Sequence, residues 1–258
     1  MKRFEPWRII LIIIILIGAT YGTYAIFKDE YKKNEPPTIQ TDNEISPSEV
    51  TEITPAEITQ EPEPEIKSEV LLNVPFTSQA PYADWDELHN EACEEASVII
   101  TAHYLDGDKQ ANIPAAEAEG EIQNMVSWEI KKLGSHRDLS AEETVNYLAK
   151  EYLSFDNAQV YTDFSRDNIK KELSDGKPVI VPAAGRLLGN PYFKQPGPVY
   201  HMLVIIGYDN NNYITNDVGT KRGREYKYPY EQLENAVHDW NGTPDNINSG
   251  QKVYITLN

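Results

Sequence analysis

The stretch that decides the fold reads QAPYADWDELHNEAC over residues 79–93 and continues as EEASVIITAHYL over residues 94–105. Polar loop residues give way at Cys93 to an apolar periodicity, which predicts a helix that begins at this residue. Cys93 is the only cysteine of the chain, so an intramolecular disulfide is excluded. A thiol at a helix start is either buried and inert or reactive as a thiolate, which the helix dipole favours.

The composition excludes one broad class of partner. The chain has 258 residues, 40% of them hydrophobic, and a formal net charge of −18. Proteins that bind nucleic acid present Lys and Arg to neutralise phosphates. A chain as acidic as this one is therefore not expected to bind nucleic acid. The apolar content is sufficient for a folded core.

Residues 1–27 are predicted to be an N-terminal membrane anchor or signal segment. An uncharged run extends from Ile9 to Phe27. At about 1.5 Å per residue it reaches roughly 28 Å, close to the thickness of the hydrocarbon layer of a bilayer. Basic residues before this run favour an N-terminus inside the cell, so we expect a single-pass anchor with the rest of the chain extracytoplasmic. A signal peptide cleaved near Ala25 is the alternative, and it would also export the remainder.

Residues 28–69 are rich in Glu, Thr and Pro, with isolated Val and Ile that cannot form a buried face. This composition predicts a disordered, self-repelling acidic linker. The folded domain is therefore expected over residues 70–258.

The order of predicted elements within that domain indicates an α+β fold, with N-terminal helices packed on a C-terminal antiparallel sheet. After an entry strand at 70–76, helices are expected over 93–105, 122–133 and 166–174, and another from the capping box of Ser140 and Glu143. The second half reads as strands over 178–182, 200–208, 213–215, 225–228 and 252–257. A turn at 209–212 joins two of these strands, and a long loop at 186–198 is expected to expose aromatic side chains.

His201 is the histidine best placed to act as a base for Cys93. It opens a strongly apolar strand, where an imidazole has little packing purpose, whereas His89, His103, His136 and His238 are expected to be satisfied or solvent-facing. If the strands on either side of the turn pair in antiparallel fashion, the end of one lies beside the start of the other. That register brings Asn216 or Asp217 near His201.

These motifs resemble a family of bacterial cysteine peptidase-like proteins related to the bacteriocin-processing, double-glycine leader peptidases of the papain-like superfamily. The resemblance covers about Leu71 to the C-terminus and is carried by VPFTSQ at 74–79, Ala92-Cys93, Tyr200-His201, GYD at 207–209 and Asn216-Asp217. It implies a papain-like fold in which Cys93 is the nucleophile, His201 its base, Asp217 the residue that orients His201, and Gln79 an oxyanion donor.

The chain departs from the family where Gly-Pro often follows the cysteine, because Glu94 and Glu95 stand there. If both glutamates are solvated, each costs the thiolate under about 1 kcal/mol, whereas an imidazolium at ~4 Å contributes roughly 4 kcal/mol. We therefore expect a thiolate–imidazolium pair that is only slightly weakened.

The resulting prediction is a thiol hydrolase that cleaves peptide bonds in a peptide or protein substrate. A catalytically weak or inactive papain-like domain that acts as a cell-surface binding module is the alternative. A cell-wall amidase is a third possibility, for which a second histidine would be expected where Asn216 and Asp217 stand. No cysteine or histidine cluster has the spacing of a zinc site, so neither a metal nor a cofactor is expected.

Overall fold

The computed structural model describes residues 66–258. The predicted membrane segment and most of the predicted linker fall on residues 1–65 and lie outside the described residues. Within residues 66–258, no helix is both long enough and apolar enough to cross a bilayer.

A seven-stranded sheet forms the centre of the described domain, and every pair of strands in it is antiparallel. Six strands follow the order β2-β7-β3-β4-β5-β6, and β1 pairs with the far end of β4. The strands are β1 (Val70–Leu71), β2 (Gln159–Tyr161), β3 (Val179–Ala184), β4 (Tyr200–Tyr208), β5 (Asn212–Asn216), β6 (Tyr226–Pro229) and β7 (Tyr254–Thr256).

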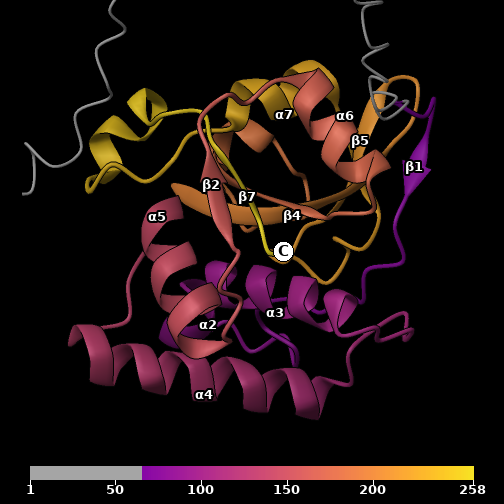
Figure 1. Ribbon diagram of the computed structural model, residues 1–258. Helices are drawn as coiled ribbons and strands as arrows, with labels where there is room; N and C mark the ends of the chain where they lie inside the picture. The colour runs from indigo at the N-terminus through magenta and orange to yellow at the C-terminus, as the bar shows by residue number, and fades with distance from the viewer. Residues whose placement is uncertain (1–65) are drawn as a thin grey trace, which may run out of the picture. The chain divides into compact units, whose positions relative to one another are not determined.

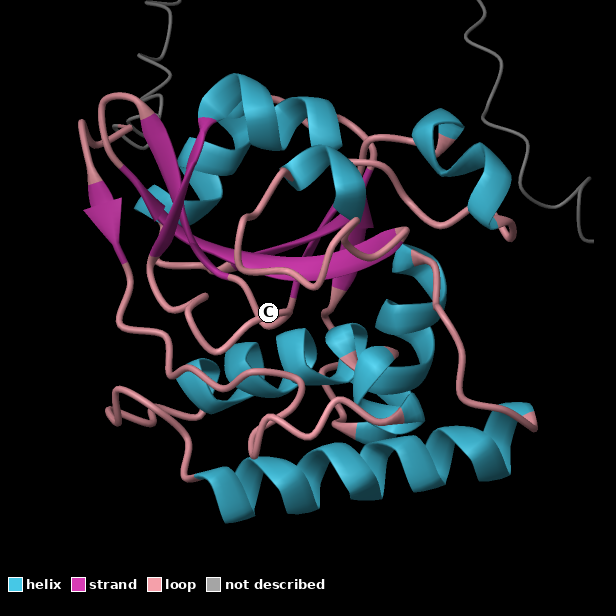
Figure 2. Ribbon diagram, turned by 180° about the vertical axis from the view of Figure 1, so that it is seen from behind, coloured by secondary structure: helices cyan, strands magenta, loops and turns pink. Residues whose placement is uncertain are grey.

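Helices cover both faces of this sheet, as Figures 1 and 2 show. The helices α3, α4 and α5 lie on one side and α6 and α7 on the other (Figure 1). Their bounds are α2 (Glu87–Asn90), α3 (Cys93–Leu105), α4 (Ala115–Leu133), α5 (Ala141–Glu143), α6 (Arg166–Ser174) and α7 (Tyr230–Ala236). A π-helix over Thr144–Tyr152 continues α5, and 3-10 helices cover Gly185–Leu188 and Pro244–Ser249.

The strand β4 is buried on both faces, which explains its continuous apolar sequence. Met202, Val204 and Ile206 belong to the core shared with α3 and α4. Leu203 and Ile205, which alternate with them, belong to the core beneath α6 and α7. This strand therefore holds its first residues, including His201, in a fixed position between the two cores.

The predicted mixture of helices and antiparallel sheet is confirmed. Cys93 is the first residue of α3, the turn at 209–212 joins β4 to β5, and the capping box of Ser140 and Glu143 is present. Gly134 ends α4 in the left-handed conformation, with φ 88°.

Several predicted boundaries were wrong. The helix α4 begins at Ala115 rather than at residue 122, because its first two turns carry too few apolar residues to show a helical stripe. The entry strand is confined to Val70–Leu71. The short strand β2 and the helix α7 were not predicted, and α6 and α7 form the second helical layer.

Candidate active site

Cys93, His201 and Gln79 line one cleft with a volume of about 1110 Å³. The start of α3 supplies Cys93 and the start of β4 supplies His201. Gln79 comes from the loop before α2, and its backbone N–H donates to the Val218 carbonyl, next to Asp217. The fold thus brings His201 to residues that lie more than 100 positions earlier in the chain.

The carboxylate of Asp217 holds the imidazole of His201. His201 Nε2 lies 2.7 Å from Asp217 Oδ1, and the two side chains are 2% and 0% exposed. With a carboxylate as its partner, Nε2 is the ring nitrogen that donates, which leaves Nδ1 to accept a proton. The Phe193 ring packs against the imidazole in a T-shaped arrangement with centroids 5.3 Å apart, so the imidazole is also fixed by packing.

Asp217 is in turn surrounded by donors. Its Oδ1 also accepts from the Gly219 N–H at 3.0 Å, while Oδ2 accepts from Asn190 Nδ2 at 2.9 Å and from the Tyr228 hydroxyl at 2.5 Å. Burial opposes ionisation of Asp217, but His201, Tyr228 and the Gly219 amide together hold the pKa of this carboxyl below its usual value. The site therefore contains a buried carboxylate that is fully hydrogen-bonded.

The alternative orienter, Asn216, does not contact His201. It lies opposite Val204 in the β4–β5 ladder, and its side chain bonds to the backbone of Val74, Pro75 and Glu225. Asn216 ties the entry segment to the sheet, and the position next to His201 belongs to Asp217.

The expectation that Glu94 is solvated was wrong. Glu94 is 1% exposed, and its Oε2 accepts from the Cys93 thiol at 3.0 Å while its Oε1 accepts from the Leu139 N–H at 2.8 Å. Burial, followed by the charge and hydrogen bond of Glu94, raises the pKa of the Cys93 thiol well above its ordinary value. In this conformation Cys93 is a thiol bound to Glu94, not the predicted thiolate of an ion pair with His201.

Glu95 is buried as well, against the same expectation. It is 1% exposed and faces Glu129 of α4 and His136 of the following loop. The sequence does not predict the burial of Glu94 and Glu95. Both precede the first apolar turn of α3 and resemble the acidic residues that are common at the start of a helix.

Gln79 lies in the cleft, but its amide already has partners. Its Nε2 donates to the carbonyl oxygens of His89 at 2.8 Å and Asn90 at 3.2 Å, and its buried Oε1 has no partner among the described residues. A donation from Nε2 to a substrate oxyanion would have to replace one of these bonds. The backbone N–H of Cys93, at the start of α3, is the other candidate donor.

The remaining histidines lie outside the Cys93 cleft. His89 bonds to Asp86 and Glu119, His103 to Asp108 and Glu121, and His238 to the Ala236 carbonyl. His136 is turned toward Glu95 with its Nε2 3.1 Å from Glu95 Oε1, so it is not solvent-facing.

Sequence reasoning did not identify Asn190 and Tyr228, which support Asp217. Asn190 precedes Pro191 in the turn of the long loop, and Tyr228 is a buried position of β6. Nothing in the local pattern separates either residue from an ordinary turn asparagine or a core tyrosine. Their role depends on pairings between elements that only the fold defines.

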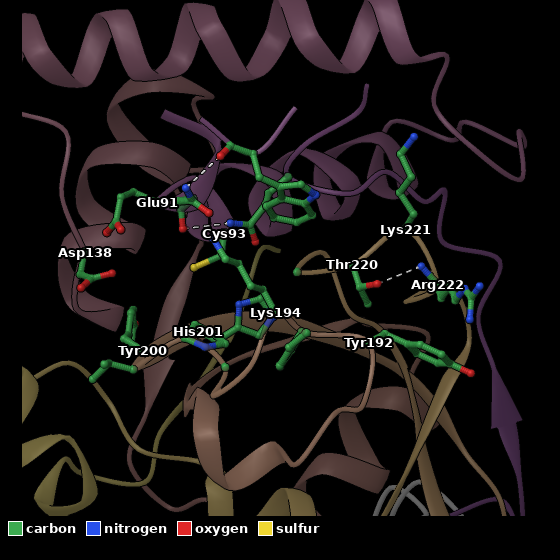
Figure 3. Close-up of a pocket in the computed structure, with 18 of the residues that line it drawn as sticks. Glu91, Cys93, Asp138, Tyr192, Lys194, Tyr200, His201, Thr220, Lys221 and Arg222 are labelled. Atoms are coloured by element: carbon green, nitrogen blue, oxygen red, sulfur yellow. Dashed lines mark hydrogen bonds between the residues drawn. The ribbon is translucent and has the colours of Figure 1, made fainter. Parts of the chain in front are cut away.

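The cleft has opposite charges at its two ends. Figure 3 shows Glu91 and Asp138 on one side of Cys93, with Lys221 and Arg222 on the other. The guanidinium of Arg222 lies 4.8 Å from the ring centroid of Tyr192, which is 45% exposed. Of the two aromatic residues expected at the tip of the long loop, Tyr192 is exposed, whereas Phe193 is buried against His201.

Comparison with known proteins assigns the chain to a family. The model of the Peptidase_C39 like family matches residues 71–246, which is more than half of the chain. No curated protein matches the chain. Among solved structures, a candidate C39-like peptidase from Bacillus anthracis has a TM-score of 0.48 and 19% sequence identity, and the match covers 74% of this chain and 98% of that chain. The extent of the family match shows that this chain belongs to the Peptidase_C39 like family, in agreement with the resemblance of its motifs to papain-like bacteriocin-processing peptidases.

Proposed function

We propose that this chain is a cysteine peptidase that hydrolyses peptide bonds with Cys93 as nucleophile, His201 as general base and acid, and Asp217 as the residue that orients His201. The observation that carries the proposal is the placement of Cys93 and His201 in one cleft, with His201 fixed by a buried carboxylate. Membership of the Peptidase_C39 like family supports a peptide or protein as the substrate.

The reaction proceeds through a thioester. His201 Nδ1 takes the proton of the Cys93 thiol as Sγ attacks the substrate carbonyl carbon, and the carbonyl electron pair moves onto oxygen. The C–N bond then breaks as the imidazolium returns that proton to the leaving amine. Water, deprotonated by His201, cleaves the thioester and restores the thiol. Throughout, the charge of Asp217 stabilises the imidazolium without taking its proton.

One rearrangement must precede the attack. The Cys93 thiol bonds to Glu94 Oε2 at 3.0 Å, so it has to rotate away from Glu94 toward His201. A rotation about χ1 of a single side chain is sufficient to break this bond. The oxyanion would be held by the Cys93 N–H and, if it exchanges a bond to His89 or Asn90, by Gln79.

The test is turnover of a proteome-derived peptide library by the purified full-length chain. We expect cleaved peptides with the wild type and none above background with Cys93→Ala or His201→Ala. The control His238→Gln alters a histidine that does not line the cleft and should retain turnover. Equal turnover by Cys93→Ala and the wild type would contradict the proposal.

A binding module without catalysis is the second candidate, favoured by the bond between the Cys93 thiol and a buried carboxylate. The two functions differ in thiol reactivity. If the chain is a peptidase, iodoacetamide should alkylate Cys93 below neutral pH when a substrate analogue draws the thiol toward His201. A binding module should show an unreactive thiol up to alkaline pH, with or without the analogue.

We propose that the domain lies outside the cytoplasm and is anchored through residues 1–27. This location is supported by the uncharged run from Ile9 to Phe27 and by the basic residues that precede it. Membrane fractionation followed by protease treatment of intact cells would test this location. Recovery of the chain in the soluble cell lysate, or protection of its folded domain in intact cells, would contradict it.

A further inference from the structure

Three ligand-type side chains converge where α3 faces α4, and none of them lines the cleft that holds Cys93 and His201. Glu95 comes from α3, Glu129 from α4, and His136 from the loop that follows α4. One carboxylate oxygen of each glutamate and one ring nitrogen of His136 all lie within 4.8 Å of one another. Glu95 lies more than 30 residues before Glu129 and His136, which is why no metal-site spacing is visible there.

These side chains are buried, yet their polar atoms lack partners. Glu95 is 1% exposed and Glu129 is 0% exposed. Neither oxygen of Glu129 has a hydrogen-bond partner among the described residues, and the same is true of Glu95 Oε2 and His136 Nε2. An unpartnered polar atom in the interior costs about 1–3 kcal/mol, and more when it is charged. Three side chains that hold buried unpartnered atoms, and whose ligand atoms lie within 4.8 Å of one another, indicate a binding site.

Neither protonation nor an ion pair accounts for all four atoms. His136 Nε2 lies 3.1 Å from Glu95 Oε1, but the ring is not aligned to donate to it. An imidazolium at His136 together with a proton on Glu129, whose pKa burial raises to about 9, would balance the charges but would still leave His136 Nε2 without an aligned acceptor. One proton shared by Glu95 and Glu129 would still leave another carboxylate oxygen and the imidazole nitrogen unsatisfied. A dication with a neutral imidazole balances both carboxylates and takes one ligand atom from each of the three residues.

We infer that Glu95, Glu129 and His136 form a binding site for a divalent transition-metal ion, with Zn²⁺ as the reference ion. One imidazole nitrogen and two carboxylates are a donor set that zinc accepts, with water completing the shell. Two ligand atoms on a tetrahedral zinc ion with bonds of about 2.0–2.1 Å lie roughly 3.3 Å apart. The 3.1 Å separation of His136 Nε2 and Glu95 Oε1 is close to this value. Because the His136 side chain is 10% exposed, the ion can enter past it from solvent.

A second cluster, formed by His103, Glu117 and Glu121, is the weaker candidate. Both ring nitrogens of His103 already have carboxylate partners, Asp108 at 3.0 Å and Glu121 at 3.0 Å. Glu117 is exposed to solvent. This cluster therefore serves as an internal control for non-specific binding by surface acids.

The test is metal binding by the full-length chain in detergent, in a Cys93→Ala background so that the only thiol cannot bind the ion. After removal of metal with EDTA and dialysis, titration calorimetry with Zn²⁺ should give one equivalent per chain and a raised unfolding temperature. Glu129→Gln and His136→Asn should each weaken binding at least tenfold. His103→Gln should leave the affinity unchanged.

A second measurement uses Co²⁺ as a spectroscopic substitute. The wild-type site should give visible d–d absorption bands that are lost in Glu129→Gln and retained in His103→Gln. Circular dichroism checks that Glu129→Gln is folded. If it is not, His136→Asn, which alters a loop, decides the outcome. The inference is overturned if Zn²⁺ does not bind at one equivalent, if Glu129→Gln and His136→Asn bind as tightly as the parent, or if only His103→Gln loses binding.

Discussion

His201 Nε2 and Asp217 Oδ1 lie 2.7 Å apart in a contact from which water is almost entirely excluded. His201 lies at the start of β4 and Asp217 in the loop after β5, so two neighbouring strands set the geometry of the pair. Because four donors surround the carboxylate, Asp217 remains ionised despite burial. The Asp217 charge is therefore available to stabilise His201 when the imidazole gains a proton.

Replacement of Asp217 by asparagine should remove that charge with little change of shape. We expect kcat/KM for peptide cleavage to fall by roughly 10³–10⁴-fold, because the imidazolium loses its partner and the wrong tautomer is favoured. Steady-state kinetics on a peptide from the library would measure the loss. Asp209→Asn, which removes a carboxylate from the β4–β5 turn, should retain activity. A loss of less than tenfold in Asp217→Asn would indicate that Asp217 does not orient the base.

Gly219 is required because no side chain fits beside His201. A Cβ at this position would lie 2.7 Å from His201 Cε1 and 2.9 Å from Phe193 Cε1. Gly219→Ala should therefore push the imidazole out of line and reduce kcat by at least tenfold, with circular dichroism unchanged. Gly120→Ala is the matched control, since a Cβ there meets nothing within 4 Å, and it should leave kcat unaffected. Wild-type kcat in Gly219→Ala would show that the site tolerates the displacement.

The sequence predicts the parts of this site that local chain geometry determines. The periodicity of residues 93–105 places Cys93 at a helix start, and the short turn at 209–212 forces β4 and β5 into antiparallel pairing. That pairing brings the loop after β5 back to the start of β4, so Asp217 reaches His201. The sequence does not decide between Asn216 and Asp217, because the irregular register between β4 and β5 shifts which residue faces inward.

Contacts between distant elements were not predictable in the same way. Burial of Glu94 depends on the Leu139 N–H, which belongs to the loop before α5. The partners of Gln79 are the carbonyls of α2, a helix of only four residues without a readable periodicity. Such polar contacts arise only when separate elements pack, so composition and spacing do not reveal them.

The charge asymmetry of the cleft predicts a preference among substrates. A basic side chain should be favoured on the side of Glu91 and Asp138, and an acidic one on the side of Lys221 and Arg222. Asp138→Asn should reduce the enrichment of Lys and Arg around the cleaved bond when library cleavage is sequenced at pH 8. Asp175→Asn, which removes a carboxylate outside the cleft, is the control. An unchanged residue profile in Asp138→Asn would contradict electrostatic selection by this end of the cleft.

Glu94→Gln should make the Cys93 thiol more acidic. The glutamine Oε1 can still accept from the Leu139 N–H, and its amide cannot carry the negative charge that opposes the thiolate at 3.0 Å. Burial and Glu95 raise the pKa of the Glu94 carboxyl well above its usual value, so this effect is expected in the alkaline range in which the thiol titrates. Because burial, Glu94 and the charge of Asp138 all raise the pKa of Cys93, the variant loses the contribution of Glu94, and its pKa should fall. Iodoacetamide alkylation, followed by mass spectrometry in the presence of EDTA, should therefore rise at lower pH than in the wild type. The alkylation midpoint should move by at least one pH unit.

Glu143→Gln removes a glutamate that does not contact Cys93 and should leave the profile unchanged. If the midpoint is the same in Glu94→Gln and the wild type, burial and Asp138 keep Cys93 protonated without Glu94, and Glu94 has only a structural role through Leu139.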